Sequence, residues 1–506
     1  MRRGRHIGEA NHPVRQHFHA EGGSGNAGRR TTTGRLAHRK DRSIMAIATT
    51  NPVTGEVLQT FDELSPEELE DKLGRAAAAA ASYRLTSVEQ RSAWLRQAAD
   101  NLEREADSVS RLITTEMGKT YRSAQEEVAK SVRGLRFYAA EGPAFLKSLQ
   151  SDASRVGAKK TYVTYQPIGP VLAVMPWNLP LWQAMRFAAP ALTAGNVGLL
   201  KHASNVPRTA LYMEQLFRDA GFPDAVFQTL LIPARRVEQV LRDDRVKAAT
   251  LTGSEPAGKS VATIAGSEIK KVVLELGGSD PFIVMPSTNL ERATDVAVKA
   301  RTLNNGQSCI NGKRFFIHTD IYDAFLERFV AKMKALVVGD PMDDTTDVGP
   351  LATESGRDDV AAYVDDALAK GAKALVGGER PGGPGWFYPP TVLVAVTPEM
   401  KMYHEEVFGP VAQVFRVSSL EEALRLANGH PYGLGSNLWS DDDDERELFV
   451  RDVQSGMAFI NGNTTSYPEI PFGGVKRSGY GRELSDLGMR EFMNAKTVWI
   501  GDDAGA

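Results

Sequence analysis

The stretch Val171-Leu172-Ala173-Val174-Met175-Pro176-Trp177-Asn178 joins a short apolar run to a proline and two polar or aromatic residues. A continuous apolar run of this length is typical of a strand that is buried on both faces, as in a parallel sheet covered by helices. The stretch therefore predicts the first strand of an α/β domain. Trp177 and Asn178 would lie just beyond its carboxyl end.

The same pattern is repeated after this strand. The expected strands are 171–175, 197–200, 226–232 and 246–250, and the expected helices are 182–192, 208–220, 235–242 and 256–266. Such alternation predicts βαβ units and a mostly parallel sheet, with ligands at the carboxyl ends of its strands. Lys201 and Ser204 follow the second strand. Thr252-Gly253-Ser254 follows the fourth and precedes a helix N-terminus, which can bind a phosphate.

Long helices precede this region. Ser65-Pro66-Glu67-Glu68 combines an N-cap serine, a proline at the first helical position and the glutamate of a capping box. Helices are expected at 76–81, 87–112 and 122–140, with breaks near Leu85-Thr86 and Met117-Gly118. The alternating stretch from Thr161 to Tyr165 predicts a strand outside the main sheet.

Residues 1–44 differ from the rest, with ten Arg or Lys against three acidic residues and little apolar periodicity. This composition cannot build a core, so we expect a disordered basic extension. A basic arm or a transit peptide is one interpretation. We favour another, in which residues 1–44 are translated sequence upstream of a true start at Met45.

Overall composition indicates an ordinary globular protein of two or three domains, because 42% of residues are hydrophobic, 24% are charged and the net charge is -3. This balance gives no reason to expect a nucleic acid or a membrane as partner, and no apolar run reaches the roughly 18 residues that span a bilayer. One cysteine and no Cys-x-x-Cys pair favour a reducing, cytoplasmic setting and argue against a structural metal.

The single cysteine, Cys309, lies among glycines and small polar residues at 304–312. Most free cysteines are small buried hydrophobic residues, whereas a nucleophilic one needs a partly exposed, electropositive setting. Glu275 stands in the apolar run 272–276, where burial should raise its pKa and suit it to general-base catalysis. A structural, ion-paired glutamate is the alternative. Together, Cys309 and Glu275 indicate a thiol nucleophile with its base.

Residues 46–501 resemble the aldehyde dehydrogenase superfamily in a series of motifs that occur in the same order. These are Pro176-Trp177-Asn178, Thr252-Gly253-Ser254, Glu275-Leu276-Gly277-Gly278, Gly306-Gln307-Ser308-Cys309, Glu405-Glu406-Val407-Phe408-Gly409-Pro410 and Pro471-Phe472-Gly473-Gly474-Val475-Lys476. The stretches 201–207, 276–281 and 386–390 resemble the bacterial, NADP-using branch of the succinate-semialdehyde dehydrogenases.

The resemblance implies an α/β aldehyde dehydrogenase fold with three parts. A Rossmann-like cofactor domain would comprise 45–150 and 167–276, an α/β catalytic domain 277–470, and a bridging, oligomerisation sheet 151–166 and 484–506. The family forms homodimers or homotetramers through that sheet.

The resemblance also implies roles for individual residues. Cys309 would attack the aldehyde, Asn178 and the Cys309 N–H would stabilise the oxyanion, and Glu275 would activate the water that hydrolyses the thioester. The cofactor would be bound by Trp177, Lys201, Ser204, Gly253, Ser254, Leu276, Glu406 and Phe408.

For the substrate, the resemblance implies a semialdehyde, succinate semialdehyde, whose carboxylate is bound by Arg186. Ser466 would assist, and Trp182 and Leu179 would pack against the chain. Some relatives carry a second arginine where this chain has Leu303, so broader use of semialdehydes such as glutarate semialdehyde remains the alternative.

NADP is expected in preference to NAD, because Ser204 stands where NAD-using relatives commonly carry a glutamate that would repel the 2′-phosphate. Lys201 would supply a cation, and His202 would add to it when protonated. The alternative is that Ser204 only caps the following helix. A cofactor-free thiol hydrolase using Cys309 and Glu275 is a second functional class, but it leaves Lys201 and Ser204 unexplained.

Overall fold

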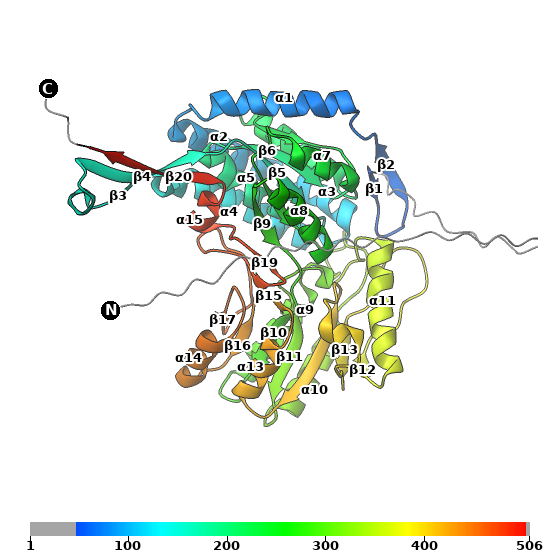
Figure 1. Cartoon of the computed structure of the whole chain (residues 1–506). Helices are drawn as coiled ribbons and strands as arrows, with labels where there is room; N and C mark the ends of the chain where they lie inside the picture. The colour runs from blue at the N-terminus through cyan, green and yellow to red at the C-terminus, as the bar shows by residue number, and fades with distance from the viewer. Residues whose placement is uncertain (1–46, 502–506) are drawn as a thin grey trace, which may run out of the picture. The chain divides into compact units, whose positions relative to one another are not determined.

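A computed structural model of the chain describes residues 47–501 (Figure 1). The basic extension expected at 1–44 therefore lies outside the described residues. No helix in the described range is long and apolar enough to cross a membrane.

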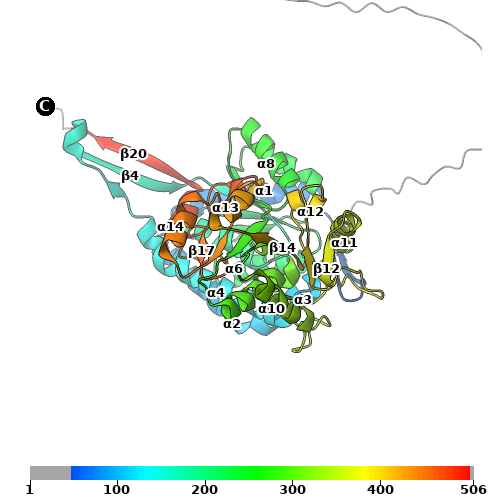
Figure 2. The ribbon, with the colours of Figure 1, turned by 90° about the horizontal axis from the view of Figure 1, so that it is seen from below.

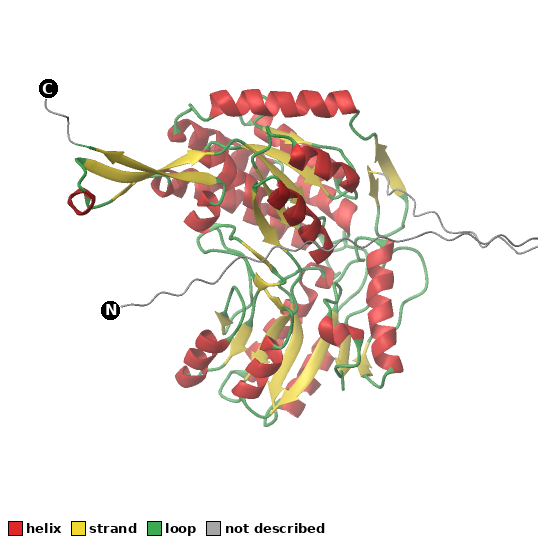
Figure 3. Cartoon of the chain, in the orientation of Figure 1, coloured by secondary structure: helices red, strands yellow, loops and turns green. Residues whose placement is uncertain are grey.

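A six-stranded sheet forms the centre of the N-terminal half (Figure 3). Its order is β19-β9-β8-β5-β6-β7, and all neighbours are parallel except β19 and β9. The strands are β5 (Pro170–Met175), β6 (Val197–His202), β7 (Phe227–Thr229), β8 (Ala248–Thr252), β9 (Lys271–Glu275) and β19 (Gly479–Tyr480). All four strands expected from the apolar runs are confirmed. The fourth extends to Thr252, and the third is shorter than expected.

Helices follow these strands as the alternation predicts. They are α5 (Trp182–Ala194), α6 (Pro207–Asp219), α7 (Val237–Arg242) after a short 3₁₀ turn (Ala234–Arg236), and α8 (Glu255–Ser267). Every residue of α5 is buried. The reason is that α5 lies between the sheet and the N-terminal helix α4, which contacts it along much of its length.

The N-terminal helices are α1 (Pro66–Tyr83), α2 (Val88–Arg104), α3 (Ala106–Met117) and α4 (Tyr121–Phe145). The capping box is confirmed, because the Glu68 N–H donates to Ser65 Oγ at 3.1 Å and the Ser65 N–H donates to Glu68 Oε2 at 2.7 Å. Gly118 ends α3 in a left-handed conformation, with φ of 81°. The break at Glu105 between α2 and α3 was not predicted, since no glycine or proline marks it.

A seven-stranded sheet organises the second half, in the order β12-β13-β14-β11-β10-β16-β17. Its strands are β10 (Asp280–Val284), β11 (Gly312–His318), β12 (Lys373–Val376), β13 (Thr391–Val394), β14 (Val411–Val417), β16 (Asn437–Trp439) and β17 (Phe459–Ile460). Only the β12–β13 pair is antiparallel. Alternate residues of β10 enter different cores, because Phe282 and Val284 belong to one cluster and Ile283 to another.

The helices of this half are α9 (Leu290–Thr302), α10 (Tyr322–Ala335), α11 (Glu354–Ala369), α12 (Lys401–His404), α13 (Leu420–Asn428) and α14 (Asp443–Asp452). Phe325 and Phe329 of α10 pack with Phe282, and Leu420 and Leu424 of α13 pack with Ile283. Helices therefore cover both faces of this sheet.

A three-stranded antiparallel sheet projects from the body as a narrow arm (Figures 1 and 2). It contains β3 (Leu149–Gln150), β4 (Lys160–Pro167) and β20 (Met493–Ile500), with a 3₁₀ turn at Ala153–Val156. The strand expected at 161–165 thus pairs outside the main sheet, with β20. Two small antiparallel pairs complete the described chain. One is the hairpin of β1 (Ile47–Thr50) and β2 (Val57–Phe61), and the other joins the distant strands β15 (Tyr432–Gly433) and β18 (Val475–Lys476).

The expected division of the chain remains a prediction, and the sheets depart from it at two places. Strand β3, at the end of the expected cofactor segment 45–150, belongs to the arm, and the other departure lies near the C-terminus. There, β19 joins the cofactor-side sheet and α15 (Ser485–Arg490) contacts α4 and α5 rather than only the arm. The C-terminal segment therefore packs against the first half of the molecule and also contributes a strand to the arm.

Candidate active site

The loop that carries Cys309 is held in a fixed, unusual backbone conformation. After α9, a 3₁₀ turn (Leu303–Gly306) contains Asn304 and Asn305 with φ of 58° and 56°, followed by Gly306 with φ of 77°. Asparagine tolerates this left-handed region better than most residues. A Cβ on Gly306 would lie 2.4 Å from the Gly409 carbonyl carbon, so only glycine fits there.

Buried amide side chains fix this loop to the rest of the fold. Asn305 Nδ2 donates to the carbonyl oxygens of Gly118 and Pro350, at 2.8 and 2.9 Å. Gln307 Oε1 accepts from the Ala352 N–H at 3.0 Å. These bonds attach the residues before Cys309 to two distant parts of the chain, at Gly118 and at 350–352.

A cavity of about 270 Å³ lies between the two large sheets and contains the predicted catalytic residues. It is built from the carboxyl ends of β5, β8 and β9, facing the nucleophile loop and the loop at 405–408. Its walls include Trp177, Asn178, Thr252, Gly253, Ser254, Glu275, Leu276, Cys309, Glu406 and Phe408. The structure thus brings together the three catalytic candidates and six of the eight cofactor candidates.

Glu275, at the end of β9, is 2% exposed, and neither of its carboxylate oxygens has a hydrogen-bond partner within residues 47–501. Burial raises the pKa of Glu275 well above its ordinary value, and the nearby Glu483 carboxylate adds to the shift. A carboxyl group with no partner, beside a cavity, is available to exchange a proton. The ion-paired structural alternative is not supported by these contacts.

Cys309 is half-buried, and burial raises the pKa of its thiol to about 12. The cation that lowers the pKa of this thiol most is Lys313, whose Nζ donates to the carbonyl oxygens of Ser308 and Cys309, each at 2.8 Å. Lys313 also pairs with Glu406 at 2.9 Å, so the two charges offset each other near the sulfur. The expected electropositive setting is therefore weaker than predicted.

Lys313 is fully buried and was missed from the sequence. The available signal was a charged residue inside the apolar strand 312–317. Through its three contacts, Lys313 connects the nucleophile loop to Glu406, the predicted cofactor residue.

Asn178 follows β5 and is buried beside Cys309. The Asn178 side-chain Nδ2 donates to the Gln307 carbonyl oxygen at 3.0 Å. The backbone carbonyl oxygen of Asn178 accepts from Asn304 Nδ2 at 2.7 Å. One of the two amide hydrogens is therefore used to align Asn178 with the nucleophile loop. The second has no acceptor within the described part of the chain.

Lys201 and Ser204 lie at the carboxyl end of β6, next to β5 but outside the cavity walls. Lys201 is 7% exposed, and burial lowers the pKa of its ammonium group. No hydrogen bond or ion pair of this ammonium occurs in the described residues, so it is available to an anion.

The alternative role of Ser204 as a helix cap is wrong. The N-cap of α6 is Val206, which makes no side-chain cap. The Glu116 carboxylate accepts from the Arg208 and Thr209 N–H groups instead, both at 3.0 Å. The Ser204 hydroxyl is thus not committed to that helix.

His202 does not provide a cation. Its Nε2 lies 2.8 Å from the Pro180 carbonyl oxygen, and its Nδ1 accepts from the Ala203 N–H. Burial lowers the pKa of His202 to about 4, so the ring is neutral near pH 7.

A second cavity of about 430 Å³ adjoins the other side of the nucleophile loop. Ser308 and Ile310, the neighbours of Cys309, line it. Three of the four predicted substrate residues, Leu179, Trp182 and Ser466, also line it.

Arg186 is the predicted substrate residue that the structure places elsewhere. It is not on the cavity wall, because its guanidinium pairs with the buried Glu483 and lies 4.4 Å from the centre of the Phe472 ring. Arg186 is close enough to Glu275 for its charge to lower the pKa of that carboxyl group, and it is not placed where the cavity would hold a substrate carboxylate. Sequence spacing alone could not identify Glu483 as its partner.

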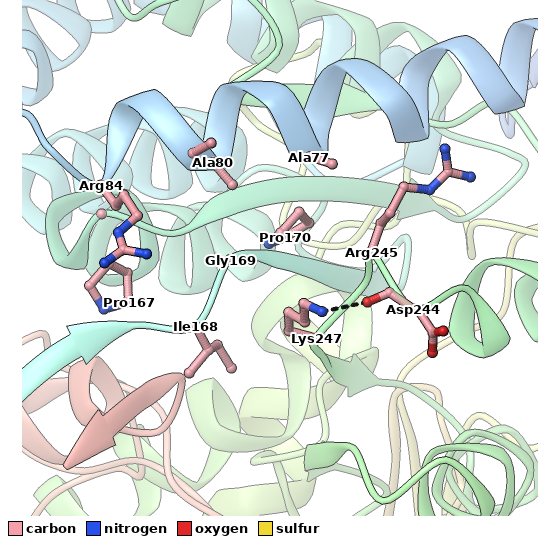
Figure 4. Close-up of a pocket in the computed structure, with 12 residues that line it drawn as sticks. Ala77, Ala80, Arg84, Pro167, Ile168, Gly169, Pro170, Asp244, Arg245 and Lys247 are labelled. Atoms are coloured by element: carbon pink, nitrogen blue, oxygen red, sulfur yellow. Dashed lines mark hydrogen bonds between the residues drawn. The ribbon is translucent and has the colours of Figure 1, made fainter. Parts of the chain in front are cut away.

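A separate open cavity of about 420 Å³ lies at the amino ends of β5 and β8, and Figure 4 shows its lining side chains. Lys247 there donates to the Asp244 carbonyl oxygen at 2.6 Å. None of the predicted site residues lines this cavity, and ligands of such sheets bind at the opposite strand ends. No group of three or more metal-ligating side chains occurs within 47–501.

Comparison with known proteins agrees with this geometry. The model of the aldehyde dehydrogenase family matches residues 38–498. The chain belongs to the aldehyde dehydrogenase family. Among its relatives is a succinate-semialdehyde dehydrogenase [NADP(+)] of Mycolicibacterium paratuberculosis, 59% identical over 458 residues, or 90% of this chain and 97% of the relative.

Further similarities support the family assignment. A succinate-semialdehyde dehydrogenase [NADP(+)] 1 of Mycobacterium tuberculosis is 58% identical over 90% of this chain and 100% of the relative. The solved structure of succinic semialdehyde dehydrogenase from Streptococcus pyogenes in complex with NADP+ is 39% identical, with a TM-score of 0.87, and covers 90% of this chain and 100% of that one. The aldehyde dehydrogenase fold expected from the sequence is thereby confirmed.

Proposed function

We propose that this chain oxidises succinate semialdehyde to succinate and uses NADP in preference to NAD. The observation that carries the proposal is that Cys309 lies between two cavities. It lines the cavity that holds the cofactor candidates, and its neighbours Ser308 and Ile310 line the other. A hydride-transferring dehydrogenase needs this arrangement, with cofactor and substrate on opposite sides of the reacting carbon. The names of the relatives support the choice of substrate and cofactor.

The residues present fit an NADP molecule. Lys201 offers an unpaired ammonium and Ser204 a hydroxyl. Position 204, at the end of β6, carries no carboxylate that would repel the 2′-phosphate. Ser254 begins α8 without a side-chain cap, which leaves the first N–H groups of that helix open to a phosphate. Trp177 and Phe408 line the cavity with Cys309 and meet edge-to-face, with their ring centroids 5.7 Å apart, so they offer aromatic surface to a flat ring. When bound, NADP supplies the nicotinamide ring that accepts a hydride.

The protein's own groups perform the remaining steps. Cys309 gives its thiol proton to solvent water and its Sγ forms a bond to the aldehyde carbon. The Asn178 amide and the Cys309 N–H then stabilise the resulting oxyanion. After oxidation, the acyl group is a thioester on Cys309. Glu275 takes a proton from water, the water oxygen bonds to the acyl carbon, and the carbon–sulfur bond breaks to release the acid and the thiolate.

We also propose that the chain forms a homodimer or homotetramer through the projecting arm. Strand β20 is an eight-residue edge with Trp499 and Ile500 exposed at 55% and 43%. Long edges with exposed apolar side chains are sites for pairing with another chain. Light scattering should give a multiple of the chain mass, and a monomer at micromolar concentration would contradict the proposal.

The function is tested by measuring kcat/KM for four aldehydes with NADP and with NAD, following reduced nicotinamide by absorbance. Succinate semialdehyde with NADP should be the best pair, ahead of glutarate semialdehyde, butanal and acetaldehyde. Equal use of butanal would remove the claim for a carboxylate substrate. Ester or thioester cleavage without any nicotinamide reduction would favour the thiol hydrolase instead.

A further inference from the structure

The wall of the second cavity contains a cation that the proposed mechanism does not use. Lys130, on α4, lines this cavity together with Trp182 and Ser466. Its Nζ donates to Ser466 Oγ at 2.8 Å and lies 5.0 Å from the centre of the Trp182 ring. The ammonium is thus positioned over the cavity rather than in bulk solvent.

Lys130 has no acidic partner in the described part of the chain. The nearest carboxylate on the same helix, Glu127, is occupied, because it pairs with the buried Lys119 and accepts from the N–H groups of Leu181 and Trp182 at 2.8 and 2.9 Å. Glu126 also borders the cavity but is exposed and forms no ion pair with Lys130. A half-buried ammonium without a counter-ion favours an anionic ligand.

The Ser466 hydroxyl is arranged in a complementary way. Its oxygen accepts one hydrogen bond from Lys130 Nζ and another from Trp182 Nε1 at 2.9 Å. Both lone pairs are then used, so the hydroxyl hydrogen is left to donate. Ser466 is 4% exposed, and this donor has no acceptor within residues 47–501.

The charge state of Lys130 is also consistent with an anionic ligand. Burial lowers the pKa of Lys130 to about 7, and the Arg186 guanidinium adds to this shift. An arriving carboxylate favours the protonated form and would raise that pKa again. A bound carboxylate would therefore give the Lys130 ammonium the counter-charge that the described residues do not provide.

We propose that Lys130 and the Ser466 hydroxyl bind the carboxylate at the far end of the aldehyde substrate. This inference rests on the function proposed above and replaces Arg186 as the group that recognises the acid. Ser308 and Ile310, the two neighbours of Cys309, line the same cavity as these donors, so a substrate with its acid at Lys130 would extend along that cavity toward the nucleophile loop. Leu303 adds an apolar surface along the wall.

The test compares kcat/KM for succinate semialdehyde with that for butanal, which has the same carbon chain without the acid. In the unmodified enzyme, a large preference for succinate semialdehyde is expected. Lys130→Met should lower that preference by about 30-fold or more, because a charged hydrogen-bond partner is lost. Lys130→Arg should retain much of it. Lys299→Met, which removes an exposed cation from the same wall, should change it by less than about 3-fold.

A second measurement needs no variant. Trace acetylation of the unmodified enzyme should modify Lys130, and succinate should protect Lys130 but not Lys299, whereas uncharged butyramide should protect neither. No preference for succinate semialdehyde in the unmodified enzyme would reject the proposed function. A strong preference that survives Lys130→Met, or acetylation of Lys130 that succinate does not change, would reject the role of Lys130 alone.

Discussion

Glu275→Gln should produce one burst of reduced NADP per active site and then almost stop, with steady-state kcat lowered by about 10²–10⁴-fold. The variant keeps Cys309 and the cavity but removes the base that activates water. Glutamine has the size of glutamate, so the buried position at the end of β9 is preserved. Stopped-flow absorbance measures the burst, and steady-state assays measure the loss of turnover.

Cys309→Ala is the matched control for the Gln variant. It should remove both the burst and the turnover, because no acyl group can form without the thiol. Steady turnover by Glu275→Gln at a rate near that of the unmodified enzyme would show that another group serves as the base. Glu483, which is buried and pairs with Arg186, would then be the next carboxylate to test.

Ser204→Glu should lower kcat/KM with NADP by roughly 10³-fold while NAD use is kept or improved. Two unit charges about 4 Å apart repel by about 4 kcal/mol at an effective dielectric of 20, and each 1.4 kcal/mol is a factor of ten. The introduced carboxylate would also pair with Lys201, the unpaired ammonium at the end of β6. Initial rates with both cofactors over a range of concentrations measure the change.

The size-matched control is Ser204→Gln, which adds the same volume without the charge. It should reduce NADP use far less than Ser204→Glu does. If the two variants are alike, steric exclusion rather than repulsion is responsible. If the unmodified enzyme already uses NAD better than NADP, the assignment of Lys201 and Ser204 to the 2′-phosphate is rejected.

The parts of the fold that local sequence signals determine were predictable. The apolar runs located β5, β6 and β8 to within about two residues, and the capping box located the start of α1. Because ligand sites occupy the carboxyl ends of parallel strands, the strand ends also indicated which polar residues would gather. Asn178, Glu275 and Gly253 do border one cavity.

Contacts between distant segments could not be predicted in this way. Arg186 lies on the expected helix, but its partner Glu483 reaches it only because β19 and α15 return to the first half of the molecule. Lys130 likewise becomes a cavity residue only when α4 packs beside the loop that carries Ser466. Such pairs depend on tertiary packing, and spacing within one helix carries no information about them.

The central claim is most directly tested by mass spectrometry of Glu275→Gln after a single turnover with succinate semialdehyde and NADP. The account predicts one succinyl group per chain, bound as a thioester and located on the peptide that contains Cys309. Butanal should give much less adduct at the same concentration. An adduct on another residue, or a burst of reduced NADP with no acyl group on Cys309, would contradict it.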